Sequence, residues 1–287
     1  MKKINWEFIF KNGTIAAILM ILTFLLPDFH FAFDISVILT IVSLLFAILV
    51  GFFIGTATTN YLRLQTLISN ANADLIQIFR LSKLIQVSSG EKIANVIDEY
   101  MIAMLDFPFL KWVPNTKKEF NEVTKAVEEV DPLNEKGLSL FSHLQNAKSD
   151  LDRTNQEISL AAEEVVSGRH WFILISLALI IATLLLSLRD GYWVFSFVNG
   201  VLLVAIYQIL TLLKEVDSNV FLAEKLGYQN PQQVFQAIGK LQYYPEVAIT
   251  KRWAKEPQEN YRIGVYKDYP SSLEKEIKIV YKDKKVF

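Results

Sequence analysis

The chain contains no cysteine among its 287 residues. Disulfides, thiolate metal sites and thiol nucleophiles are therefore excluded, and cysteine usage does not indicate a compartment. The three histidines, His30, His143 and His170, lie far apart in the sequence. Each is more readily explained as a loop, helix-surface or interface residue than as part of a shared metal site. We expect no metal and no cofactor.

An excess of charge is also missing. Lys and Arg number 29 and Asp and Glu number 30, so the net charge is −1 and no basic surplus favours nucleic acid as a partner. The chain has no phosphate-binding glycine loop, HExxH, nucleophile elbow or kinase signature. Carboxylates are adjacent at Asp98 and Glu99 and at Glu128 and Glu129, but neighbours on a helix point to different faces, so we expect solvated charges. Nothing in the sequence indicates an enzyme.

Apolar sequence is what the chain has in quantity. It is 52% hydrophobic and 21% charged, with a mean hydropathy of +0.29, which is typical of a chain divided between a membrane and water. A helix needs about 20 apolar residues to cross a bilayer core of about 30 Å. Four segments approach this length and contain no Asp, Glu, Lys, Arg or His: residues 13–27, 35–57, 171–188 and 192–213.

The connections between these segments predict two helical hairpins, because "PDFHFAFD" and "RDG" are too short to form domains. Basic residues lie mainly on the sides away from these turns, which places both termini in the cytoplasm of a multi-pass protein of the cell (inner or plasma) membrane. The N-terminus also has the basic start of a signal peptide. Glu7 and Lys11 interrupt its apolar run and no small-residue cleavage site follows Leu26, so we expect an uncleaved first span.

Several residues of the spans are candidates for particular roles. Trp171, Tyr192 and Trp193 lie at predicted span ends, where amphipathic rings are favoured, and we expect them to anchor the spans at the lipid interface. The absence of ionisable groups in the spans argues against an ion-coupled carrier. Asn199 and Gln208 are amides at membrane depth, where such groups meet a partner helix or a wet cavity, so both are helix-packing or pore-face candidates.

A small-residue face begins in the second span. Gly51 and Gly55 form a GxxxG motif, and Ala47 and Thr59 extend the same face by one turn each way. Such a face lets another helix approach closely. Two interpretations remain open: packing against the neighbouring hairpin of the same chain, or a subunit contact or pore-lining face.

The second span is predicted to continue as a rod. Apolar residues from Leu64 to Ile85 keep a spacing of three and four, and no Gly or Pro occurs before Gly90. A second rod, antiparallel to the first, is expected from about Asn134 to His170, with Asp131 as its N-cap. Between the rods we expect shorter helices, one of them opening with a capping box from Thr116 to Glu119. Residues 60–168 therefore form a helical domain.

The C-terminal part changes its periodicity. Asn230 and Pro231 begin a short helix, after which "YRIGVYK" and "EIKIVYK" alternate as strands do, which predicts a small β-containing tail at about 244–287. The stretch "KRWAK" comprises Lys251, Arg252, Trp253 and Lys255. It either contacts anionic headgroups or forms an exposed loop.

Two hairpins around a helical segment, with "YLRLQTLISNANADLIQIFRL" after the second span and "LDRTNQEISLAAEEVVSGRHWFILISLALI" leading into the third, resemble the bestrophin-like domain family over about residues 35–225. The resemblance implies a relation to bestrophin anion channels, which are oligomers with a pore along the symmetry axis and a helical cytoplasmic body. It supplies no pore-constriction or ion-binding residue position by position. The β-containing tail is not a feature associated with that family.

The expected fold is an all-α integral membrane protein with four transmembrane helices, long helical cytoplasmic extensions and a small C-terminal α+β tail. Its expected segments are 1–59 and 169–214, the two membrane hairpins, 60–168, the cytoplasmic helical domain, and 215–287, the cytoplasmic C-terminal helix and β-hairpin. The expected function is a homo-oligomeric, bestrophin-like ion channel for anions in the lipid bilayer. The alternative is a membrane-anchored scaffold or sensor whose cytoplasmic helices and tail bind a protein partner. A neutral-solute transporter is disfavoured because the hairpins share no Gly or Pro break.

Overall fold

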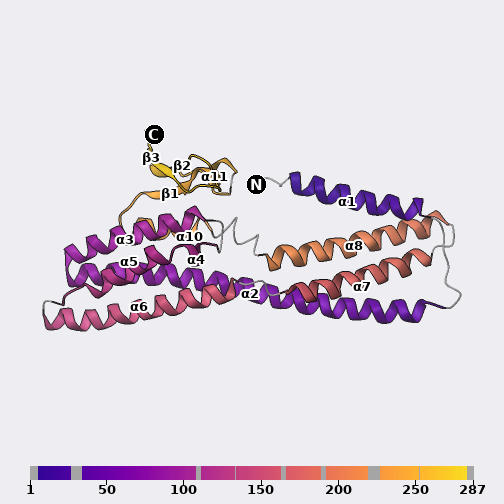
Figure 1. Cartoon of the computed structure of the whole chain (residues 1–287), viewed down its shortest axis with the longest axis horizontal. Helices are drawn as coiled ribbons and strands as arrows, with labels where there is room; N and C mark the ends of the chain where they lie inside the picture. Colours follow the sequence, from indigo (N-terminus) through magenta and orange to yellow (C-terminus); the bar gives the residue numbers. More distant parts are fainter. Residues whose placement is uncertain are drawn as a thin grey trace. The chain divides into compact units, whose positions relative to one another are not determined.

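The computed structural model describes residues 6–26, 34–107, 111–132, 134–162, 166–188, 192–218, 227–251 and 253–282. The chain divides into two compact units. The membrane unit comprises residues 1–59 and 164–218, and the second unit comprises residues 60–163 and 219–287. The helix α2 passes from the first unit into the second (Figure 1).

The described residues of the membrane unit form four helices: α1 (Trp6–Leu25), the first part of α2 (Ser36–Ile85), α7 (Gly168–Ser187) and α8 (Trp193–Asp217). Among the described residues, three helices are long and apolar enough to cross a membrane, namely α2, α7 and α8. The helix α1 begins at Trp6, and its apolar stretch, Phe10–Leu25, is shorter. The span expected at residues 13–27 therefore stays a prediction.

The helices of the membrane unit carry apolar side chains on both their inward-facing and their outward-facing sides. Phe46, Leu174 and Leu203, from α2, α7 and α8, are buried in one cluster. Large apolar side chains also point outward, as Phe172 and Val194 do. Apolar residues on the outside of a helical unit indicate contact with lipid or with further protein.

The rod predicted beyond the second span is confirmed. The helix α2 runs unbroken for 50 residues and ends at Ile85, which gives a length of about 75 Å at about 1.5 Å per residue. Leu64, Ile68, Leu75 and Ile78 are buried at the predicted spacing. These four side chains belong to the hydrophobic core that α2 shares with the other helices of the second unit.

The second rod differs from the prediction. The helix α6 (Glu135–Ala161) ends before His170, and α7 is a separate helix, since Ser167 is extended at its N-cap. Asn134, not Asp131, is the N-cap of α6, because its side-chain oxygen accepts a hydrogen bond from the Gly137 N–H at 2.7 Å.

The antiparallel arrangement of α2 and α6 is confirmed by two contacts. The Asn60 side-chain amide donates to the Ala161 carbonyl at 2.9 Å, and Arg63 pairs with Glu157 at 3.0 Å. As α2 advances, its partners on α6 come from earlier positions, so the two helices run in opposite directions.

Three further helices complete the bundle: α3 (Val87–Asp106), α4 (Trp112–Asn115) and α5 (Lys117–Glu128). A Cβ on Gly90 would lie 2.8 Å from the Lys83 Cα, so only glycine lets α3 fold back this closely on α2. The capping box at Thr116 is wrong. Because α4 immediately precedes it, the Thr116 hydroxyl donates to the Trp112 carbonyl at 3.0 Å instead of capping α5.

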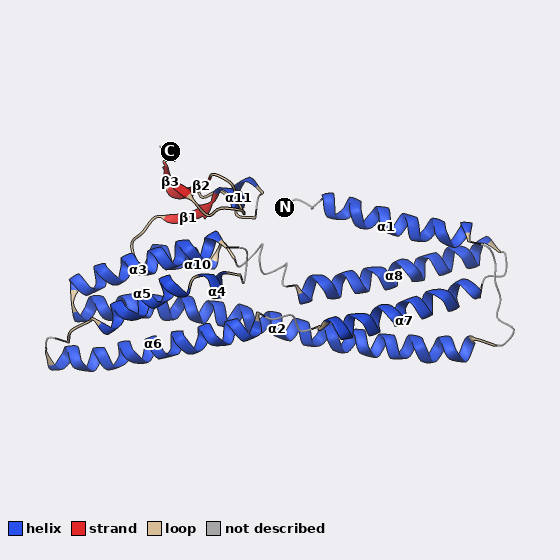
Figure 2. Cartoon of the chain, in the orientation of Figure 1, coloured by secondary structure: helices blue, strands red, loops and turns tan. Residues whose placement is uncertain are grey.

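The C-terminal module, defined as residues 227–282, contains two helices and three strands (Figure 2). These are α10 (Asn230–Ala237), β1 (Gln242–Pro245), α11 (Glu246–Thr250), β2 (Tyr261–Tyr266) and β3 (Lys275–Val280). The predicted hairpin is confirmed, since β2 and β3 pair antiparallel. Sequence reasoning missed β1, which pairs parallel with β2, because four residues ending in proline are too few to show an alternating pattern.

The sheet separates two packed layers. On one face Tyr243 enters the core shared by α2, α3, α6 and α10. On the other face Tyr244 and Tyr261 pack with Ala248 of α11 and with Ala254. The module therefore belongs to the second unit as a folded part of its core.

Candidate functional site

The small-residue face of α2 is open in this chain. Ala47, Gly51, Gly55 and Thr59 are exposed, and no described atom outside the local helix lies within 4 Å of a Cβ built on either glycine. The opposite face of the same helix is buried, for example at Phe53. The described part of the chain thus does not pack on this face, which leaves the subunit-contact or pore-face interpretation as the prediction.

The chemistry of this face is uncharged. The Thr59 hydroxyl donates to the Gly55 carbonyl at 2.9 Å, and the Thr56 hydroxyl donates to the Phe52 carbonyl at 2.9 Å. These bonds satisfy the hydroxyls within their own helix. The exposed surface of α2 thus presents small groups beside large apolar ones, as at Phe52, which is 64% exposed.

Asn199 and Gln208 occupy different environments. Asn199 is buried in α8, and its amide donates to the Leu185 carbonyl of α7 at 2.7 Å. This bond ties the α7–α8 hairpin together. Gln208 is exposed on α8.

Among the described residues, close helix approach occurs at Gly200 and not at the GxxxG motif. A Cβ on Gly200 would meet the Met20 side chain and lie 3.0 Å from the Thr23 hydroxyl oxygen of α1. The Tyr207 hydroxyl, further along α8, donates to Asn12 of α1 at 2.8 Å. The signal that could have located this crossing was the Asn199-Gly200 pair, which places an amide beside a small residue.

The predicted interface anchors lie at the ends of α7 and α8. Tyr192 and Trp193 are 69% and 71% exposed at the start of α8. Trp171 is half-buried against the membrane-unit core near the start of α7. Next to it, the His170 ring packs on Phe53 with centroids 4.8 Å apart. Their depth in a bilayer stays a prediction.

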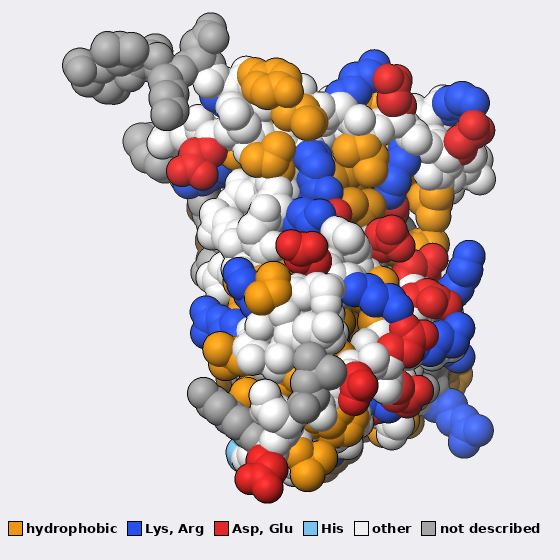
Figure 3. Space-filling view, turned by 90° about the vertical axis from the view of Figure 1, so that its left-hand side faces the viewer, with side chains coloured by type: hydrophobic (Ala, Val, Ile, Leu, Met, Phe, Trp, Pro, Cys, Tyr) orange, Lys and Arg blue, Asp and Glu red, His pale blue; other side chains and the backbone are white. Residues whose placement is uncertain are grey.

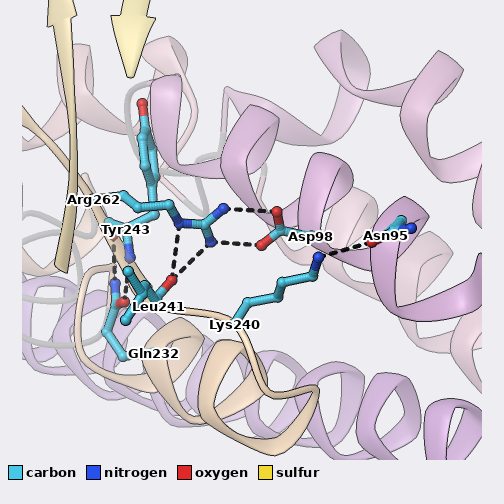
Figure 4. A network of polar contacts seen from close by, with 7 residues as sticks. All are labelled: Asn95, Asp98, Gln232, Lys240, Leu241, Tyr243 and Arg262. Carbon is cyan, nitrogen blue, oxygen red and sulfur yellow. Dashed lines mark hydrogen bonds and ion pairs between the residues drawn. The ribbon is translucent and has the colours of Figure 1, made fainter. Parts of the chain in front are cut away.

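Asp98 is not a solvated carboxylate, contrary to the expectation. Its two oxygens accept from both terminal nitrogens of Arg262 on β2, at 2.7 and 2.6 Å, and the two side chains are only 12% and 14% exposed (Figure 4). Arg262 also donates from Nε and Nη2 to the Leu241 carbonyl, at 3.0 and 2.7 Å. The expectation failed because Arg262 lies 164 positions further along the chain. Glu128 and Glu129 are themselves exposed and form ion pairs with Lys148 and Lys92.

A second carboxylate of α3, Asp106, is a buried acceptor for all three strands. The Tyr243 hydroxyl of β1 donates to it at 2.8 Å, and Tyr266 of β2 and Lys275 of β3 also contact it. Burial raises the pKa of the Tyr243 hydroxyl, and the nearby Asp106 charge raises it further. The hydroxyl therefore keeps its proton and donates. Gly264 leaves the space that the Tyr243 ring occupies, since a Cβ there would collide with that ring.

Figure 4 shows two further contacts, one between the module and α3 and one within the module. The Lys240 amine donates to the Asn95 side chain of α3 at 2.8 Å. The Gln232 amide exchanges two hydrogen bonds with the Tyr243 backbone, at 2.9 and 3.1 Å. We term the contacts of Asp98, Asp106 and Asn95 with the module the α3 clamp. No local sequence signal could have found it, because its partners come from distant parts of the chain.

The histidines and the KRWAK stretch, the other residues considered from the sequence, do not come together in one site among the described residues. The described residues contain no group of three His, Asp or Glu side chains arranged to hold a metal ion. His30 and Arg252 lie outside the described residues. Lys251 and Trp253 are exposed, with the amine 5.1 Å from the ring centroid. The surface in Figure 3 carries basic and acidic side chains intermixed, without a field of one sign.

Long apolar helices with large outward-facing side chains, joined to a helical bundle by an unbroken α2, define a polytopic membrane protein. The bestrophin-like domain model matches residues 35–217, more than half of the chain, and the chain belongs to the bestrophin-like domain family. The C-terminal module lies outside the matched residues. No curated protein sequence matches the chain.

The fold is similar to solved bacterial structures. A crystal structure of a bacterial bestrophin homolog from Klebsiella pneumoniae, carrying one substitution, has a TM-score of 0.60 at 12% identity and covers 81% of this chain and 99% of its own. A crystal structure described as a membrane protein has a TM-score of 0.60 at 13% identity, with the same coverage. At these identities the likeness shows the fold.

Proposed function

We propose that the protein is the subunit of a homo-oligomeric, bestrophin-like channel that conducts anions. The observation that carries this proposal is the open face of α2. A helix that presents Ala47, Gly51, Gly55 and Thr59 outward, while its opposite face is buried, has a surface shaped for a further helix or for a water-filled space.

The chemistry of the helices supports a passive pore. The predicted spans contain no Asp, Glu, Lys, Arg or His, so they offer no group to relay protons or to hold a coupling cation. Family membership adds the relation to bestrophins, which are anion channels and form oligomers. We place the protein in the cell membrane with four spans and both termini in the cytoplasm, on the basic residues that flank the helices.

The test is conduction by the purified full chain in planar bilayers. We expect anion-selective currents and, in detergent, a mass several times that of one subunit. Gly55→Leu should abolish the currents, because the added side chain occupies the open face. Ala17→Leu is the matched control, since Ala17 is also an exposed small residue in an apolar helix, and it should leave the currents intact. Silence together with a monomeric mass would refute the proposal.

The scaffold or sensor alternative is favoured by one observation, the exposed apolar side chains of β3, Ile277 and Ile279, which are 43% and 47% exposed. A scaffold would be silent in bilayers at every oligomeric state and would capture a cytoplasmic protein through the second unit. Silence in bilayers combined with an oligomeric mass would select this alternative over the channel.

A further inference from the structure

The sheet of the C-terminal module has one sealed edge. The strand order is β1-β2-β3, so β1 and β3 are its two edges. At β1 the Gln232 side chain donates to the Tyr243 carbonyl at 2.9 Å and accepts from the Tyr243 N–H at 3.1 Å. One amide side chain thus makes the two hydrogen bonds that the next strand would make, and β1 cannot be extended there.

The other edge, β3, is open among the residues that the structure describes. The Lys267 N–H donates to the Glu274 carbonyl, which marks these two as a hydrogen-bonded pair of the antiparallel ladder. Such pairs alternate along the strands. Glu276 and Lys278 therefore bond to β2, and Ile277 and Ile279 direct their backbone N–H and C=O groups outward.

The side chains at this edge are apolar and exposed. Ile277 and Ile279 share a face of the sheet with Arg262 and Lys275, which contact α3, because Arg262 is paired with Ile279 and Gly264 with Ile277. They nevertheless remain 43% and 47% exposed, so α3 does not cover them. An edge strand with outward backbone groups and exposed isoleucines is a template for pairing with another strand.

The charges on β3 match a second copy of β3. Glu276 and Lys278 are exposed, at 72% and 54%, lie two residues apart on one face and form an ion pair with each other at 3.1 Å, an exposed contact that a second copy can replace. If two β3 strands pair antiparallel about Ile277, each Glu276 lies opposite Lys278 of the other copy, and the two Ile277 side chains meet. A register centred on Lys278 would instead oppose two lysines. Opposite charges across strands stabilise pairing and like charges oppose it.

We propose that two copies of the chain associate through β3, with Ile277 at the centre, to form one continuous six-stranded sheet from two three-stranded ones. The contact is isologous, with a two-fold axis. In a ring of more than two subunits, neighbouring subunits contact each other through two different surfaces. The β3 contact uses the same surface on both copies, so it joins either two separate chains or two such rings. This inference does not depend on channel activity.

The absence of native cysteine permits a direct test in the full-length protein. Residues in a hydrogen-bonded cross-strand pair have Cα atoms about 5.5 Å apart, within the range that a disulfide spans. Ile277→Cys should therefore form a disulfide-linked dimer on mild oxidation, detected as doubled mass on a non-reducing gel. Glu259→Cys, at another exposed position of the module, is the control and should remain mainly monomeric there. Equal cross-linking of the two variants would overturn the proposal.

Charge exchange tests the self-pairing register. Glu276→Lys and Lys278→Glu should each reduce the cross-linked fraction of the Ile277→Cys chain at least tenfold, and the double exchange should restore it. If the double exchange fails to restore cross-linking, the two strands are not paired in this register and the proposal is wrong.

A proline variant tests the role of the outward backbone. Ile277→Pro removes an N–H that points away from β2, so the hairpin keeps its bonds while the mass of the assembly in detergent should halve. Lys278→Pro removes an N–H that donates to β2. It is the control that shows what is measured when the hairpin itself is disrupted. An unchanged mass in the Ile277→Pro protein, with the hairpin intact by hydrogen exchange, would contradict self-pairing and leave an extended segment of a different protein as the occupant of this edge.

Discussion

Arg262 on β2 and Asp98 on α3 form a bidentate ion pair with two charge-assisted bonds of 2.7 and 2.6 Å, almost out of contact with water. Such a pair is costly to break from one side, because the remaining charge stays buried without its partner. Together with Asp106, it makes the docking of the C-terminal module depend on α3. The module is thus held by polar contacts in addition to the apolar contacts of Phe235 and Tyr243.

Asp98→Ala should loosen the C-terminal module. It removes the carboxylate that pairs with the Arg262 guanidinium, and we expect a loss of about 3 kcal/mol in the free energy of opening. Hydrogen exchange of the β2 amides should accelerate by roughly 100-fold, which is the corresponding change in the opening equilibrium. Glu129→Ala removes an exposed pair with Lys92 and should change exchange little, at less than about 1 kcal/mol. Unchanged exchange in β2 of the Asp98→Ala protein would show that the ion pair does not hold the module.

Asp74 gives the second unit a dependence on pH. Burial raises the pKa of this α2 carboxyl to about 6, with a further contribution from the Asp150 carboxylate. Because the pKa is higher in the folded than in the unfolded chain, folding takes up a proton, and stability falls as the pH rises from about 4 to about 6. Asp74→Asn should raise the melting temperature at pH 7.5, with the gain vanishing near pH 4. Asp131→Asn, at an exposed carboxylate, is the control and should change the melting temperature little. An equal gain at both pH values for Asp74→Asn would contradict the assignment of the pH dependence to Asp74.

Two kinds of glycine should respond differently to leucine. Gly200→Leu places a large side chain against Met20 and Thr23, so the α1–α8 contact should fail and the protein should lose its folded fraction. A Cβ at Gly51 or Gly55 meets no described atom within 4 Å, so Gly51→Leu and Gly55→Leu should leave the chain folded while reducing the assembly to at most the pair joined at β3. Size-exclusion chromatography with light scattering separates these outcomes. An unchanged assembly mass for the Gly51→Leu, Gly55→Leu double variant would exclude this face from subunit contact.

Asn199→Leu should weaken the α7–α8 hairpin. The variant leaves the Leu185 carbonyl without its donor, and interhelical hydrogen bonds in membranes contribute about 0.6 to 2 kcal/mol. A decrease of this size in the free energy of unfolding in detergent is expected. Gln208→Leu, at an exposed amide of the same helix, should not lower it. Equal destabilisation by the two variants would indicate a general effect of amide loss.

Local patterns were sufficient for the elements and insufficient for their long-range contacts. The periodicity from Leu64 to Ile85 located the end of α2, and alternation located β2 and β3, because burial on one face imposes a period that the sequence records. The end of α6 before Ser167 was missed, since the apolar spacing continues across the break.

The α3 clamp was beyond sequence reasoning for a different reason. Asp98 looks like any surface carboxylate of an amphipathic helix until Arg262, 164 positions away, is brought to it by the fold. Gly51 and Gly55 identified a candidate contact face on α2 from the sequence. Whether the same chain covered it depended on the positions of the other helices, which no local pattern encodes.

The Gln232 amide on the backbone of Tyr243 has a consequence for the size of any assembly built through the sheet. A sheet with two open edge strands allows filaments to grow, because each added copy presents a new open edge. Here every copy brings one blocked edge, so a pair joined at β3 would present only blocked edges and growth would stop at two. A single glutamine, Gln232, thus limits the extension of the sheet to two copies.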